Sequence, residues 1–211
     1  TGLAMAGAAG GAAWLYDPRG GDEYFRDQQK AQVRKLPSFR VERPAGSVEL
    51  AIARGSDPGQ LARAAIGALG DIESFVNKGE VVLLKPNVAF DRAPLLGATT
   101  RPEVLKAVAA LCLEAGARQV LVADNPINQP EGCFFKSGLQ QAAAEVGAEL
   151  VLPMASAFEP VQIDGEVLGT WPMFYAPLAR ADKVIGIAPC KDHNLCSGSM
   201  SMKNWYGMLG G

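Results

Sequence analysis

The sequence predicts an α/β fold with a mainly parallel sheet and flanking helices in three layers. Apolar runs of strand length alternate along the chain with segments whose apolar residues follow helical spacing. Polar residues directly follow several of these runs, as expected where parallel strands end at one edge of a sheet. The chain has 211 residues and is 48% apolar, which suffices for one core. We therefore expect one α/β domain over residues 48–211.

The first elements of this domain are a strand, a helix and a second strand. Residues 48–53 (VELAIA) are predicted as the first strand. Asp57 is expected to cap a helix over 59–76, whose apolar residues recur at helical spacing. The apolar run 81–85 predicts the next strand, and Pro86 indicates that it stops there.

The middle of the domain continues the alternation. Thr100 is expected to cap a helix over 102–115, because a proline stands near its first turn and Gly116 at its end. Residues 118–123 then form an apolar run that predicts a strand ending at Asp124. The chain thus forms a strand, crosses over through a helix and forms a parallel strand.

The last part of the domain repeats the pattern with one interruption. A helix is expected over 138–146 and a strand over 149–152. Residues 161–168 predict a β-hairpin around the turn dipeptide Asp164-Gly165. A final apolar strand over 184–188 then leads into a loop rich in polar side chains.

The first residues of the chain predict a membrane anchor. Residues 1–16, TGLAMAGAAGGAAWLY, carry no charge and are rich in Ala and Gly, like the apolar part of a twin-arginine export signal. Small residues four apart, such as Ala6 and Gly10, suit packing against transmembrane helices of partner subunits in a lipid bilayer. A helix packed on the soluble domain is the alternative. An extended linker over 17–47 would hold the domain on the periplasmic or extracellular side.

Composition and cysteine spacing argue against several classes of function. The net charge of −2 and the pI of about 5.5 give no basic footprint for nucleic acid. The four cysteines lack Cys-x-x-Cys spacing, so we expect no metal site. Cys190 and Cys196 could close a small disulfide or remain thiols, and the sequence leaves both open. The chain also lacks Gly-x-Gly-x-x-Gly, Walker and Gly-x-Ser-x-Gly motifs.

The candidate site gathers the polar residues that follow the strands and the start of one helix. Four of them are candidates for catalysis, namely Lys85, Asp124, Lys191 and His193. Five more are candidates for substrate binding, namely Asn87, Arg101, Asn125, Lys203 and Asn204. The lysines would make the crevice cationic in an acidic chain, which favours a phosphate or carboxylate ligand.

Four sequence motifs together resemble the bacterial family known as domain of unknown function 362. They are VVLLKPN at 81–87, TTRPE at 99–103, VLVADNP at 120–126 and the terminal stretch DKVIGIAPCKDHNLCSGSMSMKNWYGMLGG. The resemblance implies a Rossmann-like fold and a site, but no particular reaction. Some members carry iron–sulfur clusters in an added segment, and the resemblance also implies that members continue beyond the Gly210-Gly211 match. The cofactor is therefore left open, with a cluster expected only in a segment outside this sequence.

Three functions follow from these observations. The first is a membrane-anchored, exported accessory subunit of a larger membrane complex, such as one engaged in redox chemistry or electron transfer. The second is an enzyme acting on a small anionic substrate at the carboxyl ends of the strands. The third is an iron–sulfur-associated redox protein. Whether the chain is an enzyme is left open.

Overall fold

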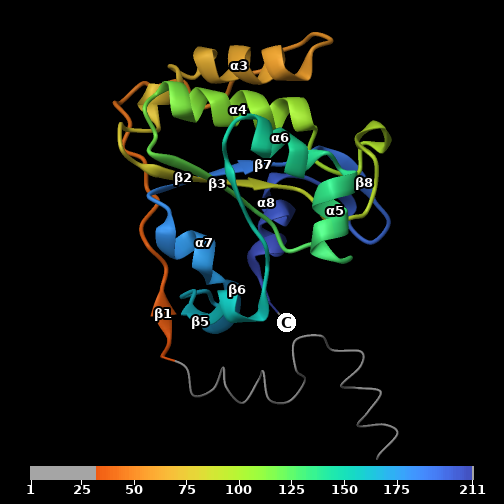
Figure 1. Ribbon diagram of the computed structural model, residues 1–211. Coiled ribbons are helices and arrows are strands. Elements are labelled where there is room, and N and C mark those ends of the chain that lie inside the picture. The colour runs from red at the N-terminus through yellow and green to blue at the C-terminus, as the bar shows by residue number, and fades with distance from the viewer. Residues whose placement is uncertain (1–31, 211) are drawn as a thin grey trace, which may run out of the picture.

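A four-stranded parallel sheet forms the centre of the computed structural model, which describes residues 32–210. The strands are β2 (Val81–Pro86), β3 (Gln119–Ala123), β4 (Glu149–Val151) and β7 (Lys183–Ile187), in the spatial order β4-β3-β2-β7 (Figure 1). The chain places β3 and β4 on one side of β2 and later returns to place β7 on the other. The strand order therefore reverses between β2 and β7, and open α/β sheets bind ligands at such a point.

Helices cover one face of this sheet. α4 (Pro102–Glu114) and α6 (Leu139–Glu145) lie on this face, α3 (Pro58–Ala68) is stacked outside α4, and α5 (Pro130–Lys136) stands at the end of the sheet (Figure 1). Val82 and Leu84 of β2 point into this layer, where they join a core that includes Leu105 and Phe134. Alternation of strand side chains explains why every second residue of β2 serves this core.

A smaller sheet and one helix cover the opposite face. The sheet pairs β5 (Phe158–Gln162) antiparallel with β6 (Thr170–Phe174) and parallel with β1 (Arg34–Lys35), and α7 (Tyr175–Arg180) follows it. Val81 and Leu83 of β2 pack into this second core. Phe158 and Phe174 stack there with ring centroids 5.2 Å apart. The central strand β2 is consequently buried on both faces.

The last part of the chain returns to the carboxyl ends of the sheet. β8 (Lys191–His193) and β9 (Ser197–Ser199) form a separate hairpin, followed by α8 (Ser201–Asn204) and the 3-10 turn η4 (Trp205–Met208). Other single 3-10 turns are η1 (Ile72–Ser74), η2 (Pro94–Leu96) and η3 (Ala155–Ala157). The hairpin and α8 lie beside β7 and supply one wall of the site described below.

The structure confirms most of the expected elements and corrects several. The four strands of the central sheet and the antiparallel pair around Asp164 are present, although β5 and β6 lie further from the turn than expected. The prediction of a strand at 48–53 was wrong, because these residues form no strand and pair with none. The first helix ends at Ala68 rather than at residue 76, and α5 and α7 were not expected.

The cap of α4 is a further correction. Arg101, not Thr100, precedes the helix, and no side chain caps it. The Thr100 hydroxyl instead accepts a hydrogen bond from the Asn87 N–H at 2.8 Å and donates one to the Ile187 carbonyl at 2.6 Å. Asp57, by contrast, caps α3 as expected, accepting from the Gln60 N–H at 2.9 Å.

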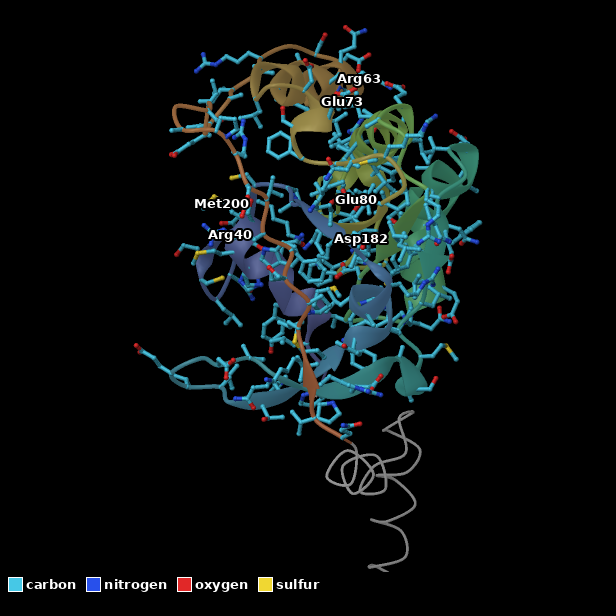
Figure 2. All side chains as sticks on the ribbon, turned by 90° about the vertical axis from the view of Figure 1, so that its left-hand side faces the viewer. Arg40, Arg63, Glu73, Glu80, Asp182 and Met200 are labelled. Atoms are coloured by element: carbon cyan, nitrogen blue, oxygen red, sulfur yellow. The ribbon has the colours of Figure 1, made fainter. Side chains whose placement is uncertain are left out.

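The expected anchor at 1–16 lies outside the described residues, but part of the expected linker is visible. Residues 32–47 run along the side of the domain, past Arg40 in Figure 2. The Arg43 guanidinium lies 4.6 Å from the centre of the Phe75 ring, and the Tyr175 hydroxyl donates to the Lys35 carbonyl at 3.4 Å. This part therefore packs on the domain. Within residues 32–210, no helix has the length and apolar character needed to cross a bilayer.

Candidate functional site

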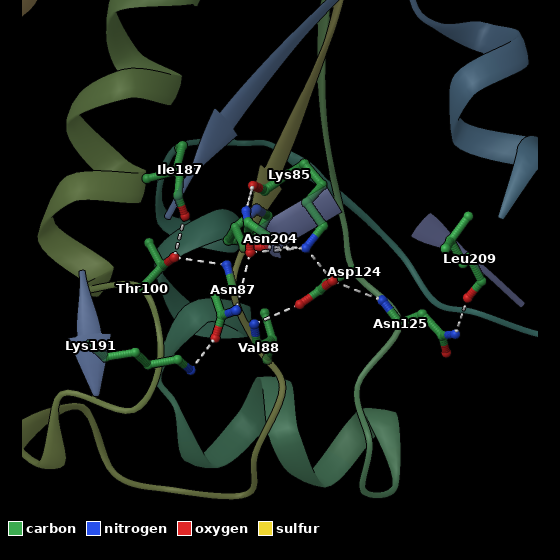
Figure 3. Close-up of polar contacts among 11 residues, drawn as sticks. Lys85, Asn87, Val88, Thr100, Asp124, Asn125, Ile187, Lys191, Asn204 and Leu209 are labelled. Atoms are coloured by element: carbon green, nitrogen blue, oxygen red, sulfur yellow. Dashed lines mark hydrogen bonds and ion pairs between the residues drawn. The ribbon is translucent and has the colours of Figure 1, made fainter. Parts of the chain in front are cut away.

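A buried ion pair joins the ends of β2 and β3. The Lys85 ammonium lies 2.6 Å from Asp124 Oδ1, and the two residues are 1% and 2% exposed. Lys85 Nζ also donates to Asn204 Oδ1 at 3.1 Å and to the Pro86 carbonyl at 2.9 Å (Figure 3). These three contacts use all three N–H groups of the ammonium. Lys85 therefore has no donor left for a ligand while this network is intact.

Burial draws the pKa values of the two partners toward each other. Burial lowers the pKa of Lys85, although the Asp124 carboxylate opposes that change. Burial likewise raises the pKa of Asp124. The charge of Lys85 and the hydrogen bonds that the carboxylate accepts from backbone N–H groups act in the opposite direction and lower it. Both changes favour the neutral forms over the ion pair. Moving a proton between Lys85 and Asp124 is thereby easier than it would be in water.

The backbone on three sides holds the Asp124 carboxylate in place. Its Oδ2 accepts from the Val88 N–H at 2.6 Å, and its Oδ1 accepts from the Asn125 N–H at 3.0 Å. Gly207 closes the third side, where a methyl group in place of a hydrogen on its Cα would lie 2.0 Å from Asp124 Oδ1. Only glycine lets the backbone approach the carboxylate this closely.

Two asparagines extend the network toward the mouth of the crevice. Asn204 Oδ1 accepts from Asn87 Nδ2 at 3.1 Å, while Asn204 Nδ2 donates to the Lys85 carbonyl at 3.1 Å (Figure 3). Asn87 Oδ1 in turn accepts from Lys191 Nζ at 2.8 Å. A continuous chain of hydrogen bonds therefore links the buried Lys85 to the partly exposed Lys191.

Two further lysines stand at the mouth with donors to spare. Lys191 Nζ donates to Asn87 and to the Ala98 carbonyl and lies 5.1 Å from the centre of the Phe90 ring, so one N–H has no hydrogen-bond acceptor among the described residues. Lys203 Nζ lies 3.1 Å from His193 Nε2, while His193 Nδ1 accepts from the Leu195 N–H at 3.2 Å. Burial, and then the charge of Lys203, lowers the pKa of Lys191. An anion between Lys191 and Lys203 would relieve this repulsion.

These side chains enclose a small crevice of about 70 Å³. Eight of the nine residues predicted from the sequence line it, namely Lys85, Asn87, Asp124, Asn125, Lys191, His193, Lys203 and Asn204. Arg101 does not line it. Its guanidinium pairs with Glu103 at 3.1 Å on the surface instead. The crevice lies at the carboxyl ends of β2 and β3, beside the point where the strand order reverses.

The loop cysteines do not form a pair in this structure. Both are free and exposed; Cys190 precedes β8, and Cys196 lies in the turn that follows it. The four residues from Cys190 to the turn at Asn194 span about 13 Å at about 3.3 Å each. A disulfide requires Cα atoms within about 7 Å. Closing one between these cysteines would require the hairpin to open.

The donors of the crevice suit an anion better than a cation. Within residues 32–210, no group of three His, Cys, Asp or Glu side chains is placed to hold a metal ion. The carboxylate of Asp124 is already occupied by Lys85 and two N–H groups. The groups that remain at the mouth are the ammonium groups of Lys191 and Lys203 and the imidazole of His193.

Sequence reasoning missed Gly207, Tyr206 and the buried role of Thr100. Gly207 and Tyr206 both line the crevice, but neither stands after a strand. Gly207 lies within the motif KNWYGMLGG, which lacks the preceding strand of a nucleotide cradle and so gives no local signal of a site. Its close approach to Asp124 depends on how η4 folds back on the sheet. No local sequence pattern predicts that arrangement.

The fold and site define an α/β domain with a polar crevice at the reversal of its sheet. Residues 82–211 match the family model described as domain of unknown function (DUF362), and the chain belongs to this family. It is also similar to a thylakoid-associated protein of Synechocystis sp., with 31% identity over 155 residues. That match covers 71% of this chain and 45% of the relative, so the chain spans less than half of the relative's length. No solved structure matches the chain.

Proposed function

We propose that this chain is a Rossmann-like domain that binds a small carboxylate or phosphate at the carboxyl ends of β2, β3 and β7 and acts on it as an enzyme. One observation carries the proposal. The ammonium groups of Lys191 and Lys203 face a crevice of about 70 Å³ with N–H groups to spare, beside the buried pair Lys85–Asp124. Lysine is a common point-charge partner for such anions.

The two sets of groups would have separate roles. Lys191 and Lys203 hold the anionic group at the mouth, and His193 at the end of β8 contacts Lys203 of α8. Lys85 and Asp124 line the same crevice and share a proton whose transfer is eased by burial. Exchange of a proton with a bound substrate would require this network to open, because all three N–H groups of Lys85 and both oxygens of Asp124 already have partners. With the network open, the reaction class that fits is proton transfer.

Calorimetric titration with orthophosphate and with acetate tests the binding step. We expect saturable binding by the wild-type protein and a loss of at least tenfold in affinity in the double variant Lys191→Met with Lys203→Met. Lys106→Met is the matched control, because Lys106 pairs with Glu145 on the helical face of the sheet. Binding that survives in the double variant, or falls equally in the control, would show that the crevice is not the site.

A second candidate is a membrane-anchored accessory subunit whose domain lies on the periplasmic or extracellular side. Two observations favour it: the thylakoid association in the name of the Synechocystis relative, and the uncharged stretch 1–16 of this sequence. The Ala/Gly-rich stretch would contact membrane subunits and lipid. Gentle detergent extraction of the native protein followed by mass spectrometry tests it. Recovery in the soluble fraction without partners would contradict it.

A further inference from the structure

A second and much larger cavity adjoins the crevice. Its volume is about 1000 Å³. Its apolar walls come from the loops that follow β3 and β4, from β6 and the loop before it, and from the last described residues. They include Leu152, Met154, Leu168, Trp171 and Leu209. The two cavities have Asn125, Ile127 and Tyr206 as common lining residues. They therefore meet along one border.

The two cavities differ in size in a way that limits what each can hold. A water molecule takes a share of about 30 Å³ of liquid. The crevice of about 70 Å³ thus accommodates little more than a carboxylate or phosphate group. The neighbouring cavity is at the upper end of the range of about 300–1000 Å³ that is usual for ligand pockets. Any larger part of a molecule held by the crevice has to extend into this second cavity.

The chemistry of the second cavity is mostly apolar. Glu131 is the one charged side chain among the described residues that line it. The Trp171 indole N–H donates to the Gly210 carbonyl at 2.8 Å, so its polar atom is satisfied and the ring is left as apolar wall. Ile127 and Met154 are 75% and 60% exposed on this surface. Covering these side chains with hydrocarbon would remove apolar surface from water.

We propose that the ligand of this domain is a single amphiphilic molecule, with a carboxylate or phosphate head on Lys191 and Lys203 and an alkyl or isoprenoid chain in the cavity lined by Leu168 and Trp171. The assignment rests on the proposed function, because it places the head in the same crevice. Charge complementarity at one end and an apolar wall at the other fix the orientation. The occupant is a dissolved molecule whose chain lies against these apolar walls, not a bilayer surface.

Calorimetric titration with three probes tests this assignment: octyl phosphate below its micelle concentration, orthophosphate and octanol. Each methylene of the octyl chain that is buried adds to the affinity, because it removes apolar surface from water. We expect octyl phosphate to bind at least tenfold more tightly than orthophosphate, and octanol to bind more weakly than octyl phosphate by a similar factor.

Two adjacent residues provide the matched variants. Leu168→Gln places a polar amide in the cavity wall and should remove most of the advantage of octyl phosphate while leaving the affinity for orthophosphate unchanged. Val167→Gln changes a neighbour that is 92% exposed and should alter neither affinity. Both variants lie in the loop between β5 and β6, so their folding is comparable by circular dichroism.

The outcomes separate this inference from the function on which it rests. Equal affinities for octyl phosphate and orthophosphate would overturn the amphiphile while leaving anion binding intact. Absence of binding by both would overturn the proposed function itself. Equal affinities for octanol and octyl phosphate would show that the phosphate head adds nothing to binding, and this would overturn the inference. Binding only to vesicles that contain an anionic phospholipid would assign this surface to a membrane and overturn it as well.

Discussion

The Thr100 hydroxyl donates a hydrogen bond to the Ile187 carbonyl at 2.6 Å, and this contact fastens the loop before α4 to the end of β7. The same oxygen accepts from the Asn87 N–H at 2.8 Å, just beyond β2. One buried hydroxyl thus joins the two strands between which the order of the sheet reverses. The crevice depends on this junction, because Asn87 and Lys191 lie on either side of it.

Thr100→Val should therefore lower the free energy of unfolding by about 1–3 kcal/mol, since it leaves the Asn87 N–H and the Ile187 carbonyl without their partner. Thr99→Val is the control. Thr99 is 1% exposed, and its hydroxyl has no hydrogen-bond partner among the described residues. That change should be neutral or slightly stabilising. Urea unfolding measures both, and equal costs at the two positions would contradict the role of Thr100.

Gly207→Ala should disrupt the buried pair, because the new methyl group would lie 2.0 Å from Asp124 Oδ1 and 2.8 Å from Lys85 Nζ. We expect a loss on the order of 3 kcal/mol in the free energy of unfolding. Gly198→Ala is the control, since a methyl group there would meet only the end of the Met200 side chain at 3.6 Å. Thermal unfolding of the two variants checks this. Similar stabilities would show that η4 can move away from Asp124 without a loss of free energy of unfolding.

Asp124→Asn should leave the Lys85 ammonium buried without a countercharge, and the expected cost is about 3–5 kcal/mol. Lys85→Met should be costly for the corresponding reason. In the double variant neither charge remains, so its cost should be well below the sum of the two single costs. A double-mutant cycle by urea unfolding measures this coupling. Additive costs would mean that the two side chains do not interact in solution.

The stability that Lys191 contributes should change with pH. Burial lowers the pKa of Lys191 in the folded protein below the value of about 10.4 expected in the unfolded chain. Between these two values the unfolded chain binds more protons, so the free energy of unfolding should rise with pH in this alkaline window. Urea unfolding of the wild type and of Lys191→Met across that window measures the difference. A difference that stays constant or falls as the pH rises would contradict the prediction.

Thiol reactivity should distinguish two exposed cysteines from two buried ones. Cys190 and Cys196 are exposed, so iodoacetamide should alkylate both in the folded protein. Cys112 and Cys133 are fully buried, and burial raises the pKa of the Cys112 thiol to about 12. These two should react only after unfolding. Mass spectrometry of tryptic peptides gives the labelling; protection of Cys190 and Cys196 that a reductant abolishes would instead indicate a disulfide.

The central sheet was predictable because its two inner strands, β2 and β3, are buried on both faces. The runs 81–85 and 118–123 are largely apolar, which is the pattern of strands in a parallel sheet covered on both sides. The polar residues that follow them were predictable for the same reason. Parallel strands deliver their carboxyl ends to one edge, and eight of the nine predicted site residues line one crevice there.

The errors arose where tertiary contacts outweigh local preference. Residues 48–53 have strand composition, but no neighbouring strand is available to pair with them. The position of Thr100 suits a helix cap, yet its hydroxyl bonds to distant backbone groups instead. The hairpin of β8 and β9 is built from KDH and SGS, which lack any alternation of apolar residues. Arg101 stands near the site in the sequence, but Glu103 engages it on the surface.

The contact between Lys85 and Asn204 joins residues 119 positions apart. During synthesis the ribosome therefore has to deliver residue 204 before Lys85 can gain this partner, so the earlier strands emerge with an incomplete set of partners. Long separations of this kind slow folding, because the chain loses the conformational entropy of the intervening loop before the contact can stabilise the native state. The crevice therefore cannot be complete before residue 204 is in place, and occupancy of the crevice would report that this late part of the chain has joined the sheet.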